Sequence, residues 1–219
     1  PYLKVAAAAA IPAVLYFISV GFMVDFEALK NDLRGLPASE LPVLSRVLKR
    51  DGHLSLPLLV IIILLVGGRT PYMAGFASIL AVVAVSFLRA HTRPNLRGIL
   101  EALKLGAEGA IVIAVTCAAA GIVIGAASLT GVAVKFAAFI LGLAGGKLYM
   151  ALPLIMISSL LLGMGLPTTA AYVMVAALAV PALVEMGVIP LAAHLFAFYF
   201  ACISAITPPV AIAAYAGAG

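Results

Sequence analysis

Two stretches of the chain combine glycine, proline and hydroxyl side chains inside runs that are otherwise apolar. The first is Gly163-Met-Gly-Leu-Pro-Thr-Thr-Ala-Ala-Tyr172, and the second is Thr207-Pro208-Pro209. Proline has no amide hydrogen and glycine loosens a helix, so several backbone groups in each stretch lose their helical partners. In hydrocarbon such groups survive only where they are buried in protein or line a polar cavity. The two interruptions therefore predict a binding site.

The chemistry available at these interruptions is that of main-chain groups and uncharged hydroxyls. Carbonyl oxygens at the end of one half-helix suit a small dehydrated cation, and amides at the start of the next suit an anion such as a carboxylate. An oxygen cage without fixed charge fits Na⁺, whereas proton-coupled carriers more often contain buried Asp, Glu or His. The candidate ion- and substrate-binding residues are Gly163, Gly165, Pro167, Thr168, Thr169, Ser204, Thr207, Pro208, Pro209 and Thr130. The predicted Na⁺ ligands are backbone carbonyls near Gly163, Gly165, Thr169 and Thr207.

Each of these features also has a structural interpretation. Thr207-Pro208-Pro209 could be a turn between two short helices, and Gly163–Pro167 could be a helix kink. We interpret His194 as a hydrogen-bonded packing residue rather than a proton carrier. The remaining candidates are interpreted as packing or interface side chains: Tyr172, Tyr199, Tyr215, Cys117 and Cys202.

Enzymatic function finds little support in the residue types. The ionisable side chains within the apolar segments are Glu108, Lys135, Glu185 and His194. They include no carboxylate pair for acid/base work, no Ser/His/Asp set, no metal-ligand spacing and no phosphate-binding glycine loop ahead of a helix. We therefore predict no catalytic residue and no cofactor, with Na⁺ acting only as a coupling ion.

The composition is that of an integral membrane protein. Of 219 residues, 65% are hydrophobic and 10% are charged, against roughly 25% charged in a soluble domain. Most of the 13 Lys and Arg and the 8 Asp and Glu, which give a net charge of +5, lie in segments 25–53 and 89–108. Basic clusters between apolar runs indicate cytoplasmic loops rather than nucleic-acid binding, which needs a basic stripe on a polar surface. The bilayer is thus a predicted partner and nucleic acid is not.

The order of apolar and polar segments predicts an all-α membrane protein, a multi-span helical bundle with a broken transmembrane helix and a re-entrant helical hairpin. Residues 1–24 form a transmembrane helix, 25–55 a cytoplasmic amphipathic connector, and 56–107 a helical hairpin plus an interfacial helix. Region 108–219 contains the broken helix at 163–169 and the hairpin tip at 207–210. Within it, Thr168 or Thr169 is expected to cap a helix that continues to about Pro181 or Met186.

Several motifs resemble one transporter family. Gly163–Tyr172, Pro181-Ala-Leu, Ala193-His-Leu-Phe-Ala-Phe-Tyr-Phe and Ser204-Ala-Ile-Thr-Pro-Pro-Val210 are similar to the C-terminal half of the large, DctM-like membrane subunit of tripartite ATP-independent periplasmic (TRAP) transporters. Residues 11–16 and 119–131 resemble the subgroup of fused small-plus-large permeases that work with TAXI-type binding proteins. The likeness covers most of the chain.

This resemblance implies a sodium-driven importer of small organic anions in a bacterial or archaeal cytoplasmic membrane. The partners implied are an extracytoplasmic substrate-binding protein and a remaining N-terminal part of the permease, with the first repeat and the small-subunit helices. By resemblance the chain is one repeat of an inverted-repeat elevator transporter, in which 163–169 and 207–210 share a Na⁺ site. Two alternatives stay open, namely an ion-coupled anion carrier that needs no binding protein and a non-transporting membrane scaffold.

Overall fold

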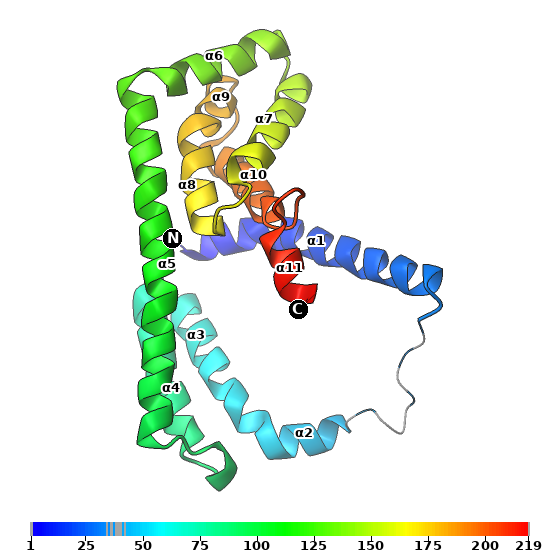
Figure 1. Cartoon of the computed structure of the whole chain (residues 1–219), viewed down its shortest axis with the longest axis vertical. Coiled ribbons are helices and arrows are strands. Elements are labelled where there is room, and N and C mark those ends of the chain that lie inside the picture. Colours follow the sequence, from blue (N-terminus) through cyan, green and yellow to red (C-terminus); the bar gives the residue numbers. More distant parts are fainter. Residues whose placement is uncertain (1, 34, 36, 38–40, 42, 219) are drawn as a thin grey trace. The chain divides into compact units, whose positions relative to one another are not determined.

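The computed structural model describes residues 2–33, 35, 37, 41 and 43–218, and those residues form helices and turns with no strand (Figure 1). The chain divides into two compact units, residues 1–102 and 103–219. The first unit contains α1 (Tyr2–Lys30), α2 (Leu44–Asp51), the 3₁₀ turn η1 (Gly52–Ser55), α3 (Leu56–Val66), α4 (Pro71–Ser86), the 3₁₀ turn η2 (Ala90–Thr92) and the start of α5 (Leu96–Leu129). The second contains the rest of α5, α6 (Val132–Ala144), α7 (Leu148–Gly163), α8 (Thr168–Leu178), α9 (Val180–Glu185), α10 (Pro190–Ser204) and α11 (Ile212–Ala218).

Two helices, α1 and α5, are long and apolar enough to cross a membrane. Their most apolar windows are 0% and 6% buried. Apolar helices with so little buried surface are unlike the core helices of a soluble protein and need lipid or further protein around them. The membrane class predicted from composition is thereby supported by the exposure of these helices.

The α1 helix is longer than the apolar run that predicts it. The run ends at Val24, whereas the helix continues to Lys30, where the Asn31 side chain donates to the Glu27 carbonyl at 2.9 Å. The amphipathic helix expected further along the connector is α2, none of whose residues is buried. Parts of the predicted connector, residues 34, 36, 38–40 and 42, lie outside the described residues.

Within 56–107, the region of the expected hairpin and interfacial helix, α3 and α4 pack against each other. The Ser78 hydroxyl donates to the Pro57 carbonyl at 3.0 Å across the pair. In the turn Gly68 has a φ of +76°, and the Thr70 hydroxyl caps α4 by accepting from the Met73 amide. With 11 residues, α3 is about 16 Å long, shorter than the roughly 30 Å of hydrocarbon.

The expected interfacial helix and the following span form one continuous helix, α5, of 34 residues. Its first turn is capped by Asn95, whose Oδ1 accepts from the Gly98 amide at 2.6 Å. No proline separates the two predicted parts, and residues 99–105 are mostly strong helix formers, so the helix is not interrupted at Gly106.

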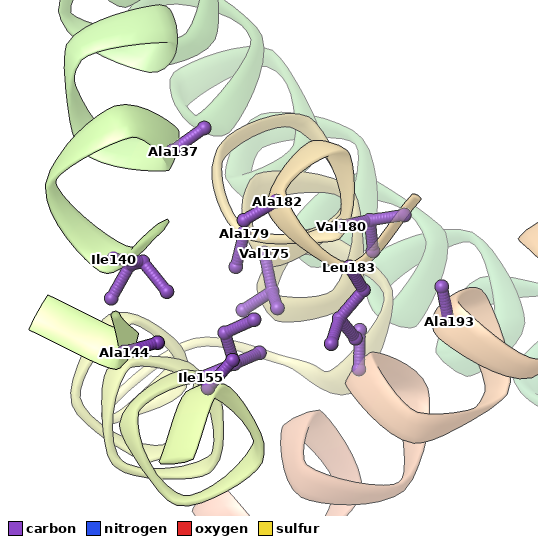
Figure 2. Close-up of a cluster of buried hydrophobic side chains, with 12 residues drawn as sticks. Ala137, Ile140, Ala144, Ile155, Val175, Ala179, Val180, Ala182, Leu183 and Ala193 are labelled. Carbon is purple, nitrogen blue, oxygen red and sulfur yellow. The ribbon is translucent and has the colours of Figure 1, made fainter. Parts of the chain in front are cut away.

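The core of the second unit lies where α7, α8 and α10 pack together, with α6 and α9 alongside. Ile155 of α7, Val175 of α8 and Leu183 of α9 are fully buried. Figure 2 shows these side chains meeting Ile140 of α6 within one cluster. Much of the remaining cluster is alanine, which lets the helices approach closely.

The single helix expected from Thr168 to about Pro181 or Met186 is two helices, so that prediction was wrong. Helix α8 ends at Leu178, and α9 begins at Val180 with Pro181 in its first turn. Proline has no amide to donate, and its ring clashes with the carbonyl four residues earlier, so the break falls just ahead of it. Gly187, with a φ of +85°, then leads into α10 at Pro190.

Candidate ion and substrate site

Apart from Ile155, the residues on the buried faces of α7 and α10 are small, and the two helices pack against each other. The buried residues of α7 recur at every fourth position, and those of α10 are all alanine or serine. On α7 they are Ala151, Ile155, Ser159 and Gly163, and on α10 they are Ala193, Ala197, Ala201 and Ser204. Stripes of this kind allow two helix backbones to come close. Each stripe ends at an interruption, so the packing brings the two interruptions together.

Gly163 and Ser204 lie close together where α7 and α10 meet. A Cβ atom placed on Gly163 would overlap the Ser204 side chain, with 2.9 Å to its Cβ, and would lie 3.4 Å from the Ala171 Cβ. A Cβ on Gly165 would lie 3.7 Å from a Val210 methyl group. Gly165 of the first interruption thus lies beside Val210 of the second, and Gly163 lies beside Ser204 at the end of α10.

The first interruption leaves backbone groups without partners. After Gly163 the chain is extended at Met164, and Gly165 has a φ of +79°. Among the described residues, no hydrogen bond reaches the carbonyls of Met164, Gly165 and Leu166. The Gly163 carbonyl already accepts from the Leu166 amide at 3.2 Å. The free acceptors therefore lie between the two half-helices, just beyond Gly163.

The second interruption is a tight turn after α10. The Thr207 amide donates to the Ser204 carbonyl at 3.2 Å, and the Thr207 carbonyl accepts from Ala211 at 3.1 Å. The Pro208-Pro209 peptide bond is cis. Within the described part of the chain, the carbonyls of Ile206, Pro208 and Pro209 accept no hydrogen bond, so this turn also presents free acceptors.

The hydroxyls of Ser204 and Thr207 donate to their own helix. Ser204 Oγ donates to the Ala201 carbonyl at 2.7 Å, and Thr207 Oγ1 donates to Ile203 at 2.9 Å. A hydroxyl that has used its hydrogen keeps its oxygen lone pairs as acceptors, which is the form that binds a cation. Sequence analysis missed Ser159, which is fully buried one turn before Gly163 and donates to Ile155. The spacing of four residues, which places Ser159 on the same helix face as Gly163, was the signal that could have indicated it.

The threonines that follow the first interruption do not cap α8, so that prediction was wrong. Pro167 occupies the N-cap position in an extended conformation, which makes Thr168 the first helical residue and removes both threonines from the capping position. Because Thr169 lies within α8, its carbonyl belongs to the hydrogen-bond ladder of the helix. It is a poorer candidate ligand than the free carbonyls of 164–166.

Thr130 is not brought to the interruptions. Its hydroxyl donates to the Ala126 carbonyl of its own helix at 2.7 Å, and the residue is exposed. In Figure 1 the corner between α5 and α6 lies toward the α9 end of α8, away from the connection between α7 and α8.

One known protein family matches the whole length of the chain. The family model described as tripartite ATP-independent periplasmic transporter, DctM component, matches residues 1–219. The chain belongs to this family. It is therefore a membrane permease component of a TRAP transporter, and its family is a transport family, not an enzyme family. The general partners of such a component are a binding protein and a small subunit. Comparisons with curated proteins and with solved structures gave no match.

In this TRAP permease component, Tyr172 and His194 join α8 to α10 beside the interruption. The Tyr172 hydroxyl lies 2.9 Å from His194 Nδ1, and its ring packs edge-on against Phe198. These contacts agree with the packing roles that the sequence indicates for both residues. Cys117 and Cys202 are free and half-buried, and Cys117 packs beside the Ala170–Met174 cluster.

Removing the Tyr172 hydroxyl is expected to loosen α8 from α10. Tyr172→Phe should lower the free energy of unfolding by about 1 kcal/mol, the usual value of one hydrogen bond. Unfolding of the purified protein in mixed detergent micelles measures this change. Tyr149→Phe, at an exposed tyrosine of α7, is the control and should leave stability unchanged; equal losses in both variants would contradict the assignment.

Proposed function

We propose that this DctM chain provides an ion and substrate site of a sodium-coupled secondary importer of small organic anions, carboxylates among them. The observation that carries the proposal is the contact between the two interruptions, Gly163 against Ser204 and Gly165 against Val210. Free carbonyls on both sides of this contact, together with the oxygens of Ser204 and Thr207, are neutral ligands of the kind that binds Na⁺. No negative side chain is required.

The anion part of the proposal is supported by the start of α8. Among the described residues, the amides of Thr168, Thr169 and Ala170 donate no hydrogen bond. Unpaired amides and the positive end of the helix dipole favour a carboxylate at this position. A Na⁺ ion held by the neighbouring carbonyls would add to that attraction, which would couple binding of the two solutes.

In this proposal the permease receives its substrate from an extracytoplasmic binding protein and moves by an elevator mechanism in a bacterial or archaeal cytoplasmic membrane. The chain supplies one of two inverted repeats, and the remaining N-terminal part supplies the other along with the small-subunit helices. These features rest on the family resemblance of the motifs at 163–172 and 204–210.

Removing the Thr207 hydroxyl is expected to weaken Na⁺ binding. Thr207→Val keeps the side-chain shape but removes one oxygen, so the Na⁺ concentration for half-maximal uptake should rise about tenfold, equivalent to roughly 1.4 kcal/mol. Uptake is measured with the complete permease in liposomes, and the Na⁺-induced rise in melting temperature gives binding separately. Thr130→Val is the matched control and should leave both values unchanged.

The alternatives give different results in the same assay. Uptake that persists without the binding protein would indicate the binding-protein-independent carrier. Unchanged Na⁺ dependence in Thr207→Val would place the ion elsewhere. If Na⁺ neither stabilises the protein nor drives uptake of any organic anion, the two interruptions are kinks in a membrane scaffold.

A further inference from the structure

A cluster of exposed cations lies at the open end of the α3–α4 hairpin, in the unit of residues 1–102. Helix α2 carries Arg46, Lys49 and Arg50 at spacings that place them on one helix face. Arg89 and Arg93 flank η2, beyond the end of α4. All five side chains are exposed, so the two basic segments that the sequence analysis identified meet at this end of the hairpin.

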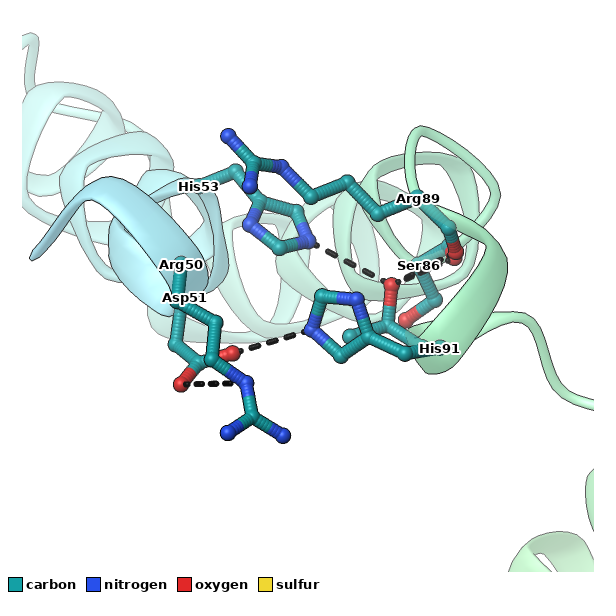
Figure 3. Close-up of polar contacts among 7 residues, drawn as sticks. Arg50, Asp51, His53, Ser86, Arg89 and His91 are labelled. Atoms are coloured by element: carbon teal, nitrogen blue, oxygen red, sulfur yellow. Dashed lines mark hydrogen bonds and ion pairs between the residues drawn. The ribbon is translucent and has the colours of Figure 1, made fainter. Parts of the chain in front are cut away.

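A polar network holds these two segments together. His91 Nε2 lies 3.0 Å from Asp51 Oδ1, and Asp51 also pairs with Arg50 at 3.9 Å. His53 Nε2 lies 3.3 Å from the Thr92 hydroxyl. Figure 3 shows Arg50, Asp51 and His53 on one side of this network and Ser86, Arg89 and His91 on the other.

His53 bonds to a hydroxyl that also contacts backbone carbonyls. The Thr92 hydroxyl donates to the Ser86 carbonyl at 2.9 Å. That hydroxyl also lies 3.1 Å from the Arg89 carbonyl. Because both carbonyls can only accept from it, the tautomer with a hydrogen on His53 Nε2 is the one that completes the network. The end of α2 is therefore bonded to the loop after α4, and the cations of both segments are held on one side of the hairpin end.

Three of these cations have no partner within the described part of the chain. The side chains of Arg46, Lys49 and Arg89 make no ion pair or hydrogen bond there. The acid of the network, Asp51, already pairs with Arg50 and His91. The described residues thus leave an excess of positive charge at this end of the hairpin.

Helix α2 also exposes an apolar face beside its cations. Leu44, Val47 and Leu48 are 71%, 42% and 58% exposed, and their spacing places them on one side of the helix. A helix with basic side chains on one face and exposed leucines on the other is typical of segments that lie in the membrane interface. Phosphate groups of anionic lipids complement its cations.

We propose that α2 and η2 form a binding site for anionic phospholipid headgroups, separate from the transport function proposed above. The apolar face of α2 enters the acyl boundary of the bilayer. The side chains of Arg46, Lys49 and Arg89 bind the lipid phosphates, while the Asp51–His91 pair keeps α2 at the hairpin end. The occupant is the lipid surface itself, because the exposed leucines lie next to the unpaired cations.

The test titrates the purified full chain, in a neutral detergent, with phosphatidylglycerol or phosphatidylcholine. Bound lipid is counted by native mass spectrometry and the melting temperature is followed in parallel. Each interfacial cation contributes about a fivefold gain for anionic lipid, so phosphatidylglycerol should bind roughly 100-fold more tightly than phosphatidylcholine. In the variant R46Q/K49Q/R89Q this preference should fall to within a few-fold of one.

The control is R69Q/K135Q/K147Q, which removes the same total charge at three exposed positions outside the cluster. It should keep the preference for phosphatidylglycerol. For the unmodified chain, 0.5 M NaCl should reduce the preference, since salt screens exposed charges. Equal binding of the two lipids, or equal losses in both variants, would overturn the proposal. So would soluble glycerol phosphate or an acidic peptide binding as tightly as phosphatidylglycerol.

Discussion

Gly163→Ala is expected to remove most Na⁺-dependent uptake and to lower the free energy of unfolding by about 1–3 kcal/mol, the usual cost of overpacking. An added methyl group at this position overlaps the Ser204 side chain, so α7 and α10 must separate where the two interruptions meet. The free carbonyls on either side of that contact then move apart. Uptake into liposomes and unfolding in mixed micelles measure the two losses.

A second substitution distinguishes local crowding from a general defect. Ser204→Gly removes the atoms that the new methyl group overlaps, so the pair G163A/S204G should recover stability relative to Gly163→Ala. Gly125→Ala is the control, because an added Cβ there meets nothing within 4 Å. A loss in Gly125→Ala as large as that in Gly163→Ala, or no recovery in the pair, would show that the contact with Ser204 is not the cause.

Ile155→Ala is expected to produce the largest loss of stability, about 2–5 kcal/mol. Ile155 is fully buried between α7 and the helices that pack on it, and truncation leaves a cavity where van der Waals contacts are lost. In lipid, packing of this kind is a main source of helix association. Thermal unfolding of the purified chain measures the change.

Ile157 provides the comparison for this prediction. It lies on the same helix and has the same side chain, but it is 50% exposed, so Ile157→Ala should change stability by less than about 0.5 kcal/mol. Similar melting temperatures for the two variants would contradict the packing described for α7. A selective loss in Ile155→Ala would confirm it.

Much of the fold could be predicted because apolar runs and turn residues act locally. Helix α7 ends at Gly163, where the first expected interruption begins, and α10 ends at Ser204, just before the second. The division into α8 and α9 was missed, although Pro181 was its signal. The predicted threonine cap also failed, because Pro167 holds an extended backbone and takes the N-cap position itself.

The site could be predicted only as two separate stretches. Each interruption is recognisable from its glycine, proline and hydroxyl residues, because glycine and proline disturb the helical hydrogen bonds of the backbone around them. The pairing of Gly163 with Ser204 depends on the packing of α7 against α10, which local sequence does not determine. The same holds for the burial of Ser159, which follows from the packing of α7 and not from its neighbours in the sequence. Thr130, in contrast, was predicted as a site residue, but its hydroxyl bonds only to its own helix.

The length of α5 relates the chain to the thickness of a membrane. Its 34 residues extend about 51 Å, some 20 Å more than the hydrocarbon layer. Its four charged residues, Arg97, Glu101, Lys104 and Glu108, lie in its first part. The uncharged remainder from Gly109 to Leu129 measures about 31 Å, one full crossing. The part of α5 after Glu108 is thus long enough by itself to cross the hydrocarbon layer, and all the charges of the helix lie before that part.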